Sequence, residues 1–344
     1  MRTKNEKKSA ETKSAWKELN HRIGDNNVKL LLIAVGMFLI MAALRPKLFL
    51  NPISLRTMGV QMAEMGLFSI AMMIVFISGG IDLSIIAIAN LTSVLIGLLM
   101  QMPAVEAGSA GTIALMIVLS FIIAIVMGII LGGINGYLIA RFSLQPMLVT
   151  LGTMNLYMGI AIVLTKGKAL SGFPPMVTDF GNGTPLGIPV PFIILVVVVA
   201  AIAVILNHTK YGFDLKLFGT NALASRFSGI PNTVVTVKTY IISGVISAIT
   251  GVEMMTRTNT ARADFGNSYL FISILCAILG GTAPEGGEGS LLGLVLAFTI
   301  LQILSSGFNM LSISSIMKDF IWGALLLGVM ALNHVIAERR RKQI

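Results

Sequence analysis

Residues 207–232 read NHTKYGFDLKLFGTNALASRFSGIPN and form a polar stretch between two apolar runs of membrane-spanning length. The runs are Pro191–Leu206 before the stretch and Thr233–Met255 after it. Such runs favour helices, because a backbone inside a bilayer has to satisfy its own hydrogen bonds. The sequence therefore predicts membrane-spanning helices on both sides of a polar connector.

The connector contains start and stop signals for a short helix of its own. Thr220 or Asn221 suits the N-cap of a helix over Ala222–Phe227, since both side chains can accept a hydrogen bond from the first turn. Gly229 suits the left-handed position after the last turn, and Pro231 stops the helix from continuing.

The short helix has an apolar face. Leu223 and Phe227 are four residues apart, so their side chains share one side of the helix, and Ile230 can pack back on the last turn. A connector between two spans does not need a capped amphipathic helix, which favours a docking role. A well-ordered connector without further function is the alternative.

The composition excludes a soluble globular domain. Of 344 residues, 55% are hydrophobic and 12% are charged, and the mean hydropathy is +0.88. The net charge of +10 comes from basic residues that flank apolar runs, which is the pattern that orients membrane proteins, so no nucleic-acid partner is expected. The single cysteine, Cys276, lies in an apolar run and excludes an internal disulfide.

The apolar runs predict an all-α membrane protein, a polytopic bundle of about ten transmembrane helices with one short cytoplasmic helix. A basic N-terminal tail over 1–27 precedes a transmembrane domain over 28–337, which includes the connector 207–232, and a basic tail over 338–344 follows. The predicted spans are Val28–Leu44, Leu55–Ser78, Leu83–Met100, Gly111–Ala140, Pro146–Thr165, Val190–Leu206, Thr233–Met255, Tyr269–Leu279, Leu291–Ser305 and Lys318–Ala337.

The basic residues predict that both termini are cytoplasmic. With this orientation the inner side holds seven Lys or Arg in the first tail, six near inner span ends and four in the second tail, 17 of the 25 in the chain. Positive residues concentrate on the cytoplasmic side of membrane proteins. The same count places the connector 207–232 in the cytoplasm.

Two Gly-Gly breaks interrupt the apolar pattern. SGGIDLS (residues 78–84) contains Gly79, Gly80 and Asp82, and LGGTAPEGGEGS (residues 279–290) contains Gly280 and Gly281. We predict a gate or helix break at these five residues. Asp82 is either a substrate or gate residue, since ionisable groups near a membrane interior are usually functional, or a structural cap of the following helix.

Three glycines in the fourth predicted span suggest close helix packing. Gly128, Gly132 and Gly136 recur every four residues and leave one helix face bare. Close packing against another helix is the preferred interpretation over a direct ligand role.

The sequence offers no catalytic or metal-binding constellation. It has no phosphate-binding GxxxxGK[ST] loop, and its three histidines lie apart from possible co-ligands. No cofactor is expected to bind this chain. Uncharged polar residues occur at intervals within the predicted spans, and their side chains suit a neutral polyhydroxylated solute better than an ion. The candidate lining residues are Gln61, Asn90, Thr92, Asn135 and Asn155, with interhelical hydrogen bonding as the alternative for each.

Three motifs together resemble a known family. GGIDLS, then LFGTNALASRFSGI, then ARADFGNSYLF followed by LGGTAPEGGEGSLLG are similar to motifs of the integral-membrane permeases of bacterial sugar ABC importers. This group includes ribose, xylose, rhamnose and autoinducer-2 systems. Each motif alone is weak, but their order and spacing are specific, and the resemblance extends from the first span to the last.

The resemblance implies a permease that carries a neutral sugar or sugar-like polyol across the bacterial inner membrane by alternating access. Its implied partners are a cytoplasmic ATPase that hydrolyses ATP, an extracytoplasmic sugar-binding protein, a second permease copy or paralogue, and membrane lipid. The implied ATPase-coupling residues are Gly219, Asn221, Ala224, Ser225, Gly229 and Ile230.

Two other functions are compatible with the residues. One is a secondary, ion-coupled sugar carrier without an ATPase, although such carriers normally bury several charges. The other is a membrane scaffold or receptor subunit that does not transport.

Overall fold

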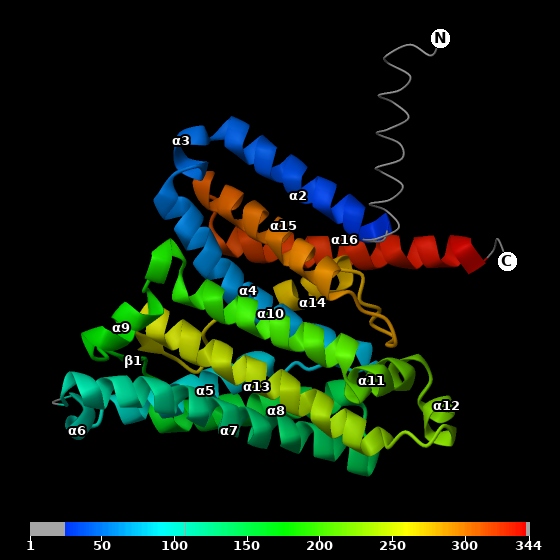
Figure 1. The fold of residues 1–344 in the computed structure, drawn as a ribbon, viewed down its shortest axis with the longest axis horizontal. Helices are drawn as coiled ribbons and strands as arrows, with labels where there is room; N and C mark the ends of the chain where they lie inside the picture. Colours follow the sequence, from blue (N-terminus) through cyan, green and yellow to red (C-terminus); the bar gives the residue numbers. More distant parts are fainter. Residues whose placement is uncertain (1–24, 107, 342–344) are drawn as a thin grey trace, which may run out of the picture.

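The computed structural model describes residues 25–106 and 108–341, so most of the predicted N-terminal tail (1–24) and the last three residues of the C-terminal tail (342–344) lie outside the described residues. The chain is a helical bundle (Figure 1). Its long helices are α2 (Asp25–Leu44), α4 (Pro52–Ile77), α5 (Ile85–Met100), α7 (Ala110–Phe142), α8 (Pro146–Thr165), α10 (Val190–His208), α13 (Asn232–Thr258), α14 (Ser268–Leu279), α15 (Leu291–Met310) and α16 (Ser315–Arg341).

These ten helices correspond to the ten predicted spans, and the predicted all-α polytopic fold is confirmed. Seven of them are long and apolar enough to cross a membrane: α2, α4, α7, α8, α10, α13 and α15. The helices α5 and α14 are shorter apolar helices of 16 and 12 residues.

Several short elements connect the spans. They are α3 (Pro46–Phe49), α6 (Pro103–Glu106), α9 (Pro175–Gly181), the 3-10 helix η1 (Pro185–Gly187), α11 (Lys210–Thr220) and α12 (Ala222–Phe227). An antiparallel pair of two-residue strands, β1 (Leu170–Ser171) and β2 (Thr260–Ala261), joins the loop after α8 to the loop after α13.

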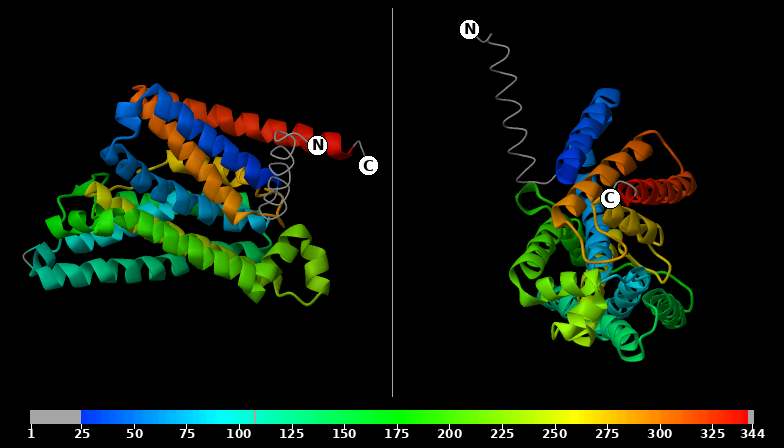
Figure 2. Two further views of the ribbon diagram at one scale, coloured as in Figure 1. Left: turned by 45° about the horizontal axis from the view of Figure 1, so that its top comes forward. Right: turned by 90° about the vertical axis from the view of Figure 1, so that its right-hand side faces the viewer.

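The helix α4 runs through the centre of the bundle. In its most apolar 18-residue window, 89% of the residues are buried, compared with 61% in the corresponding window of α13. In Figures 1 and 2, α2, α15 and α16 lie on one side of α4, and α5, α7, α8 and α13 lie on the other. Both α4 and α13 are therefore surrounded mainly by other helices of the bundle.

The glycine face of α7 packs against α13, as predicted. A Cβ atom on Gly128 would overlap the backbone of Val245, and one on Gly136 would lie 2.7 Å from the Cα of Val237. Between them, Gly132 faces the carbonyl oxygen of Tyr240. The bare face lets the two backbones touch, and the predicted close packing is confirmed.

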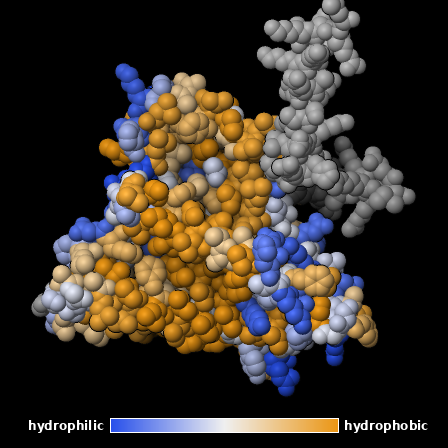
Figure 3. All heavy atoms as spheres, viewed as in Figure 1, coloured by the Kyte–Doolittle hydropathy of each residue, from blue (hydrophilic) through white to orange (hydrophobic). Residues whose placement is uncertain are grey.

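The surface divides into an apolar band and two polar ends. Large apolar side chains are exposed along α2, α7, α8 and α10, among them Leu39, Val118, Val163 and Val197. Figure 3 shows this hydrophobic band between hydrophilic ends, one of which carries α11 and α12 (Figure 1). This end is called the α12 end below. The band is the surface that a bilayer would cover.

Candidate functional site

The helix α12 has the residues and the N-cap that the sequence predicts. Oδ1 of Asn221 accepts hydrogen bonds from the backbone N–H of Leu223 at 3.0 Å and of Ala224 at 2.9 Å. Of the two predicted caps, Asn221 is thus the one used, whereas the Thr220 hydroxyl donates to Lys216 in the preceding helix.

The last turn of α12 is closed by a Schellman motif. Gly229 has a φ of 78°, which glycine adopts without strain. The N–H of Gly229 donates to the carbonyl of Arg226, and the N–H of Ile230 donates to the carbonyl of Ser225, both at 3.1 Å. Asn232, at the start of α13, donates from Nδ2 to the Ala222 carbonyl at 2.7 Å. Both ends of α12 are therefore fixed relative to α13.

The apolar face of α12 points away from the bundle. The side chains of Leu223 and Phe227 are 66% and 86% exposed, at the end of the molecule where hydrophilic residues gather (Figure 3). A phenyl ring this exposed outside the apolar band lacks a lipid environment. Exposed apolar side chains on a rigid polar end are typical of a protein-docking surface.

The helix α11, which the sequence did not reveal, carries α12. The Tyr211 hydroxyl lies 2.8 Å from that of Thr239 on α13. Burial raises the pKa of Tyr211 above its ordinary value, so the hydroxyl keeps its proton. This contact couples α11 to α13, so a force on α12 reaches two points of α13.

Three remote backbone segments meet where α11 ends. A Cβ atom on Gly219 would overlap both the carbonyl oxygen of Ile77, the last residue of α4, and the amide nitrogen of Gly287. The N–H of Gly287 donates to that same carbonyl at 2.9 Å. Gly219, a predicted coupling residue, therefore lies in a backbone-to-backbone contact that excludes any side chain.

The two predicted helix breaks belong to the same contact. Gly79 has a φ of 77° and Gly286 a φ of 99°. A Cβ on Gly286 would lie 2.7 Å from the Gly219 carbonyl oxygen and 2.8 Å from the Gly79 amide nitrogen. Gly79, Gly219, Gly286 and Gly287, with Ile77, are called the glycine junction below. It brings together the three motifs that the sequence singled out separately.

The other Gly-Gly residues, Gly80, Gly280 and Gly281, have neighbours outside this junction. A Cβ on Gly80 would lie 2.6 Å from the Tyr240 hydroxyl. A Cβ on Gly280 would lie 2.7 Å from the Cα of Leu294 in the first turn of α15, and Gly281 faces Asn26 at the start of α2. The predicted gate role of these glycines stays a prediction. Gly280 faces the backbone of α15, whereas Gly80 and Gly281 face side chains of other helices.

Asp82 is fully buried directly after α4. Its Oδ1 accepts from the N–H and Oγ of Ser84 at 3.0 and 2.6 Å, and its Oδ2 accepts from Oγ of Ser243 on α13 at 2.9 Å. Asn135 of α7 in turn donates to Ser84 Oγ at 2.8 Å. Asp82 thus ties the start of α5 to α13 and α7. The N-cap position of α5 is occupied by Ser84 and not by Asp82, and the gate role of Asp82 stays a prediction.

A second polar region lies in the opposite half of α4. A cavity of about 420 Å³ opens between α4, α14, α15 and α16. Its lining includes Gln61, Arg257, Tyr269, Gln302 and Trp322. Because Arg257 is at the end of α13 far from α12, this cavity lies toward the end of the bundle opposite the α12 end.

A buried carboxylate stands beside this cavity. Glu64 is fully buried and accepts from Nε of Arg257 and from the hydroxyl of Tyr269, each at 2.6 Å. One turn before Arg257, Glu253 is buried with no hydrogen-bond partner for either carboxyl oxygen within the described chain. Glu64, Arg257 and Tyr269 therefore form a charge-assisted link between α4, α13 and α14.

The five candidate lining residues are scattered. Gln61 lines the cavity, accepting from Gln302 Nε2 at 3.0 Å. Asn90 donates to the carbonyls of Ala263 and Phe265, and Asn135 to Ser84. Thr92 is buried, and its hydroxyl has no partner in the described residues. Asn155 is exposed on α8 and bonds its own helix.

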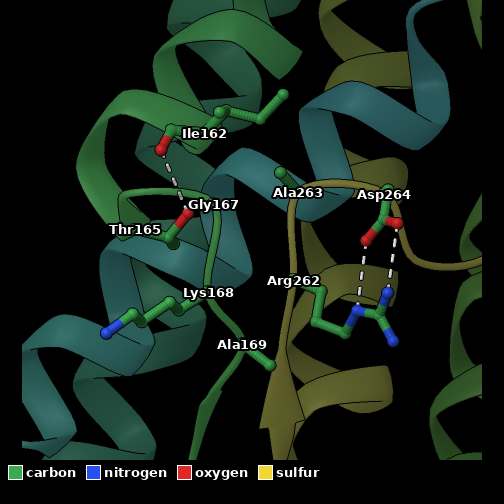
Figure 4. A pocket seen from close by; sticks show the side chains of 8 residues that line it. All are labelled: Ile162, Thr165, Gly167, Lys168, Ala169, Arg262, Ala263 and Asp264. Atoms are coloured by element: carbon green, nitrogen blue, oxygen red, sulfur yellow. Dashed lines mark hydrogen bonds and ion pairs between the residues drawn. The ribbon is translucent and has the colours of Figure 1, made fainter.

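A second cavity of about 420 Å³ lies beside the strand pair (Figure 4). Arg262 and Asp264 form a bidentate ion pair there, in which Nε and Nη2 of the arginine each lie 3.1 Å from a carboxylate oxygen. The side chain of Lys168 points away from this pair (Figure 4). Both charges are largely exposed, so the pair contributes little stability. The cavity is at the same end of the bundle as Arg257.

Arg257, Tyr269 and Trp322 were not predicted as site residues from the sequence. An available signal was the pair of opposite charges in two spans, Glu64 near the start of one and Arg257 near the end of another. In antiparallel helices these positions fall at the same depth. Tyr269 and Trp322 carried no comparable signal, because aromatic residues are common in spans.

Comparison with known proteins defines the class. The family described as branched-chain amino acid transport system / permease component matches residues 54–330, and the chain belongs to this family. The ribose import permease protein RbsC of Bacillus subtilis is 34% identical over 306 residues, 87% of this chain and 91% of that protein. The autoinducer 2 import system permease protein LsrD of Yersinia enterocolitica is 33% identical over 280 residues, 80% and 81% of the two chains.

A further relative is LsrD of Salmonella typhimurium, 31% identical over 282 residues, which cover 80% of this chain and 82% of that protein. No solved structure matches the chain. The resemblance to sugar importer permeases is thus confirmed at the level of the family.

Proposed function

We propose that this chain is the permease subunit of an ABC importer and carries a neutral sugar or sugar-like polyol through the bacterial inner membrane by alternating access. A separate cytoplasmic ATPase hydrolyses ATP, an extracytoplasmic binding protein delivers the solute, and a second permease copy or paralogue completes the path. The named import functions of the relatives support the substrate class.

The observation that carries the proposal is the exposed face of α12. Leu223 and Phe227 project from a helix that is capped at both ends and held by α11 and α13. A rigid element of this kind transmits a displacement, whereas a loose loop would absorb it. The ATPase docks on this face, which places the α12 end and both termini in the cytoplasm.

The movement of α12 has a direct route into the bundle. Asn221 alone separates α11 from α12, and Gly219, near the end of α11, touches the end of α4 and the loop before α15 through backbone atoms. Displacement of α11 therefore displaces α4, which runs to the cavity beside Gln61. The helix α4 thus connects solute binding at the cavity end of the bundle with ATP turnover at the α12 end.

The test is uptake of labelled sugar into proteoliposomes that contain this permease with the ATPase and binding protein of the same system. Uptake is expected only with ATP inside the compartment that the ATPase faces. Uptake without the ATPase would contradict the proposal.

A secondary carrier is the alternative, because three carboxylates, Glu64, Asp82 and Glu253, are buried inside the bundle. Such groups are common in proton relays of carriers. Liposomes that contain the permease alone separate the two functions. Accumulation of sugar on a proton gradient would establish the carrier, and no accumulation is expected from the importer.

A further inference from the structure

The cavity beside Gln61 has the size and composition of a small-molecule site. Its volume of about 420 Å³ falls in the roughly 300–1,000 Å³ range of ligand pockets. One part of its lining is aromatic, with Tyr269, Phe265 and Trp322. Another part is formed by the side-chain amides of Gln61 and Gln302, which come from α4 and α15.

Each of the two amides has one polar atom that is not used in a hydrogen bond within the described residues. Gln302 Nε2 donates to Gln61 Oε1 at 3.0 Å and to Ser306 Oγ at 3.1 Å. Within residues 25–106 and 108–341, Gln61 Nε2 and Gln302 Oε1 make no further hydrogen bond. The pair therefore offers the NH2 group of Gln61, with two donor hydrogens, and the amide oxygen of Gln302 as an acceptor, and hydroxyl groups of a ring can bind to both.

Of the charged side chains in the lining, Arg257 is ion-paired with Glu64, whereas Lys318 and Asp319 each make a hydrogen bond to a neutral side chain. Nε of Arg257 is bonded to Glu64 at 2.6 Å, Lys318 to Asn309 Oδ1, and Asp319 Oδ1 to Ser268 Oγ at 2.7 Å. A ligand with its own charges would have to compete with these contacts. The cavity thus favours an uncharged ligand over an amino acid, which carries a carboxylate and an ammonium group.

We infer that this cavity, between α4, α14, α15 and α16 of a single protomer, is a binding site for a neutral polyol ring. The Gln61–Gln302 pair hydrogen-bonds two of its hydroxyl groups, and the indole of Trp322 packs against its C–H face. The inference rests on the proposed function and adds to it a location and two specificity residues. It also places solute contact on α4, the helix whose other end is in the glycine junction.

Intrinsic fluorescence reports on the site directly, because the chain has only two tryptophans, Trp16 and Trp322. In the Trp16→Phe background, the full chain in lipid nanodiscs is titrated with D-ribose, D-xylose, L-rhamnose and glycerol, and separately with L-leucine. A saturable change in Trp322 fluorescence is expected with at least one of the polyols and not with L-leucine.

The variants are Gln61→Leu and Gln302→Leu, which remove the amides at nearly constant volume. The control is Gln145→Leu, the same exchange at an exposed residue whose side chain makes no capping bond. Each cavity variant is expected to weaken polyol binding about tenfold, the effect of losing one or two hydrogen bonds, and the control to bind as the parent does.

Equal binding by the cavity variants and the control would overturn the inference, as would the absence of a response to any polyol. A response to L-leucine alone would establish the zwitterion as the ligand and overturn the polyol class. ATP-driven sugar uptake by the assembled importer is measured in parallel. If the parent protein shows no ATP-driven uptake, the proposed function is refuted. If the parent protein does show uptake and both variants bind polyols as the parent does, only the assignment of the cavity as a binding site is refuted.

Discussion

The two ends of α4 make contact with the rest of the molecule in different ways. At Ile77, α4 meets Gly219 and Gly287 through backbone atoms, with no room for a side chain. In its other half, α4 presents Gln61 and Glu64, whose side chains reach α13, α14 and α15 around a cavity. A backbone contact fixes position, and a side-chain network beside a cavity can exchange partners. The Ile77 end of α4 is therefore suited to transmit movement, and the half with Gln61 and Glu64 is suited to admit a solute.

The largest expected effect is at the glycine junction. Gly219→Val would place three carbons where the Ile77 carbonyl and the Gly287 amide already lie, and neither backbone can rotate away. Overpacking of this kind costs about 3 kcal/mol or more. We expect a large loss of thermal stability in nanodiscs, measured by differential scanning fluorimetry on intact chains.

The matched control is Gly152→Ala, in a helix position where a Cβ meets no atom within 4 Å. Alanine is the better helix former, so this variant should be as stable as the parent. A Gly219→Val protein as stable as the parent would show that the glycine junction can accommodate a side chain and does not fix the position of α4.

The next effect is at the cavity end. Glu64→Gln keeps the volume but removes the charge that pairs with Arg257 and accepts from Tyr269. Arg257 is partly exposed, which moderates the loss, and we expect a destabilisation of about 2–3 kcal/mol. The thermal melting point of the variant in nanodiscs measures it. A melting point equal to that of the parent would show that the link between α4, α13 and α14 is not needed.

A smaller effect is expected for Tyr269→Phe, which removes one hydrogen bond and leaves the Glu64–Arg257 pair in place. The expected loss is about 1 kcal/mol. A double-mutant cycle with Glu64→Gln measures the coupling between the two residues, and additivity would contradict direct contact.

The smallest effect on stability is expected at the exposed face of α12. Phe227→Ser should change the free energy of unfolding by no more than about 0.5 kcal/mol, because the ring touches little of the bundle. A substantial loss of stability on melting would indicate that the ring packs within this chain and is not reserved for a partner.

The sequence predicts the spans well, because the length of an apolar run is set by the membrane. Pro146–Thr165 has the predicted ends, and the helix Ala222–Phe227 is predicted to the residue from its caps. The helix α11 was not predicted, although it has a local start signal. The Thr209 hydroxyl caps its first turn by accepting from the N–H of Gly212. Tyr211 bonds Thr239, and Gly212 packs against the backbone of Leu206.

The sites are predictable only in part. Every segment of the glycine junction was marked by its glycines, yet only the fold shows that residues 77, 219 and 287 meet. The lining of the cavity comes from five helices, α4, α13, α14, α15 and α16, and Gln61 was its one member among the candidate lining residues. The other predicted polar residues are used mostly in hydrogen bonds within the bundle, which a sequence cannot distinguish from solute contacts.

The proposed mechanism requires that the α12 end receives the ATPase while the opposite end holds the solute. Its most direct test is ATP hydrolysis by the partner ATPase, reconstituted in nanodiscs with the double variant Leu223→Ser/Phe227→Ser. We expect hydrolysis to fall about tenfold or more below that of the parent complex, as it does when apolar anchors of an interface are removed, while the permease itself stays folded. Hydrolysis at the parental rate would contradict it.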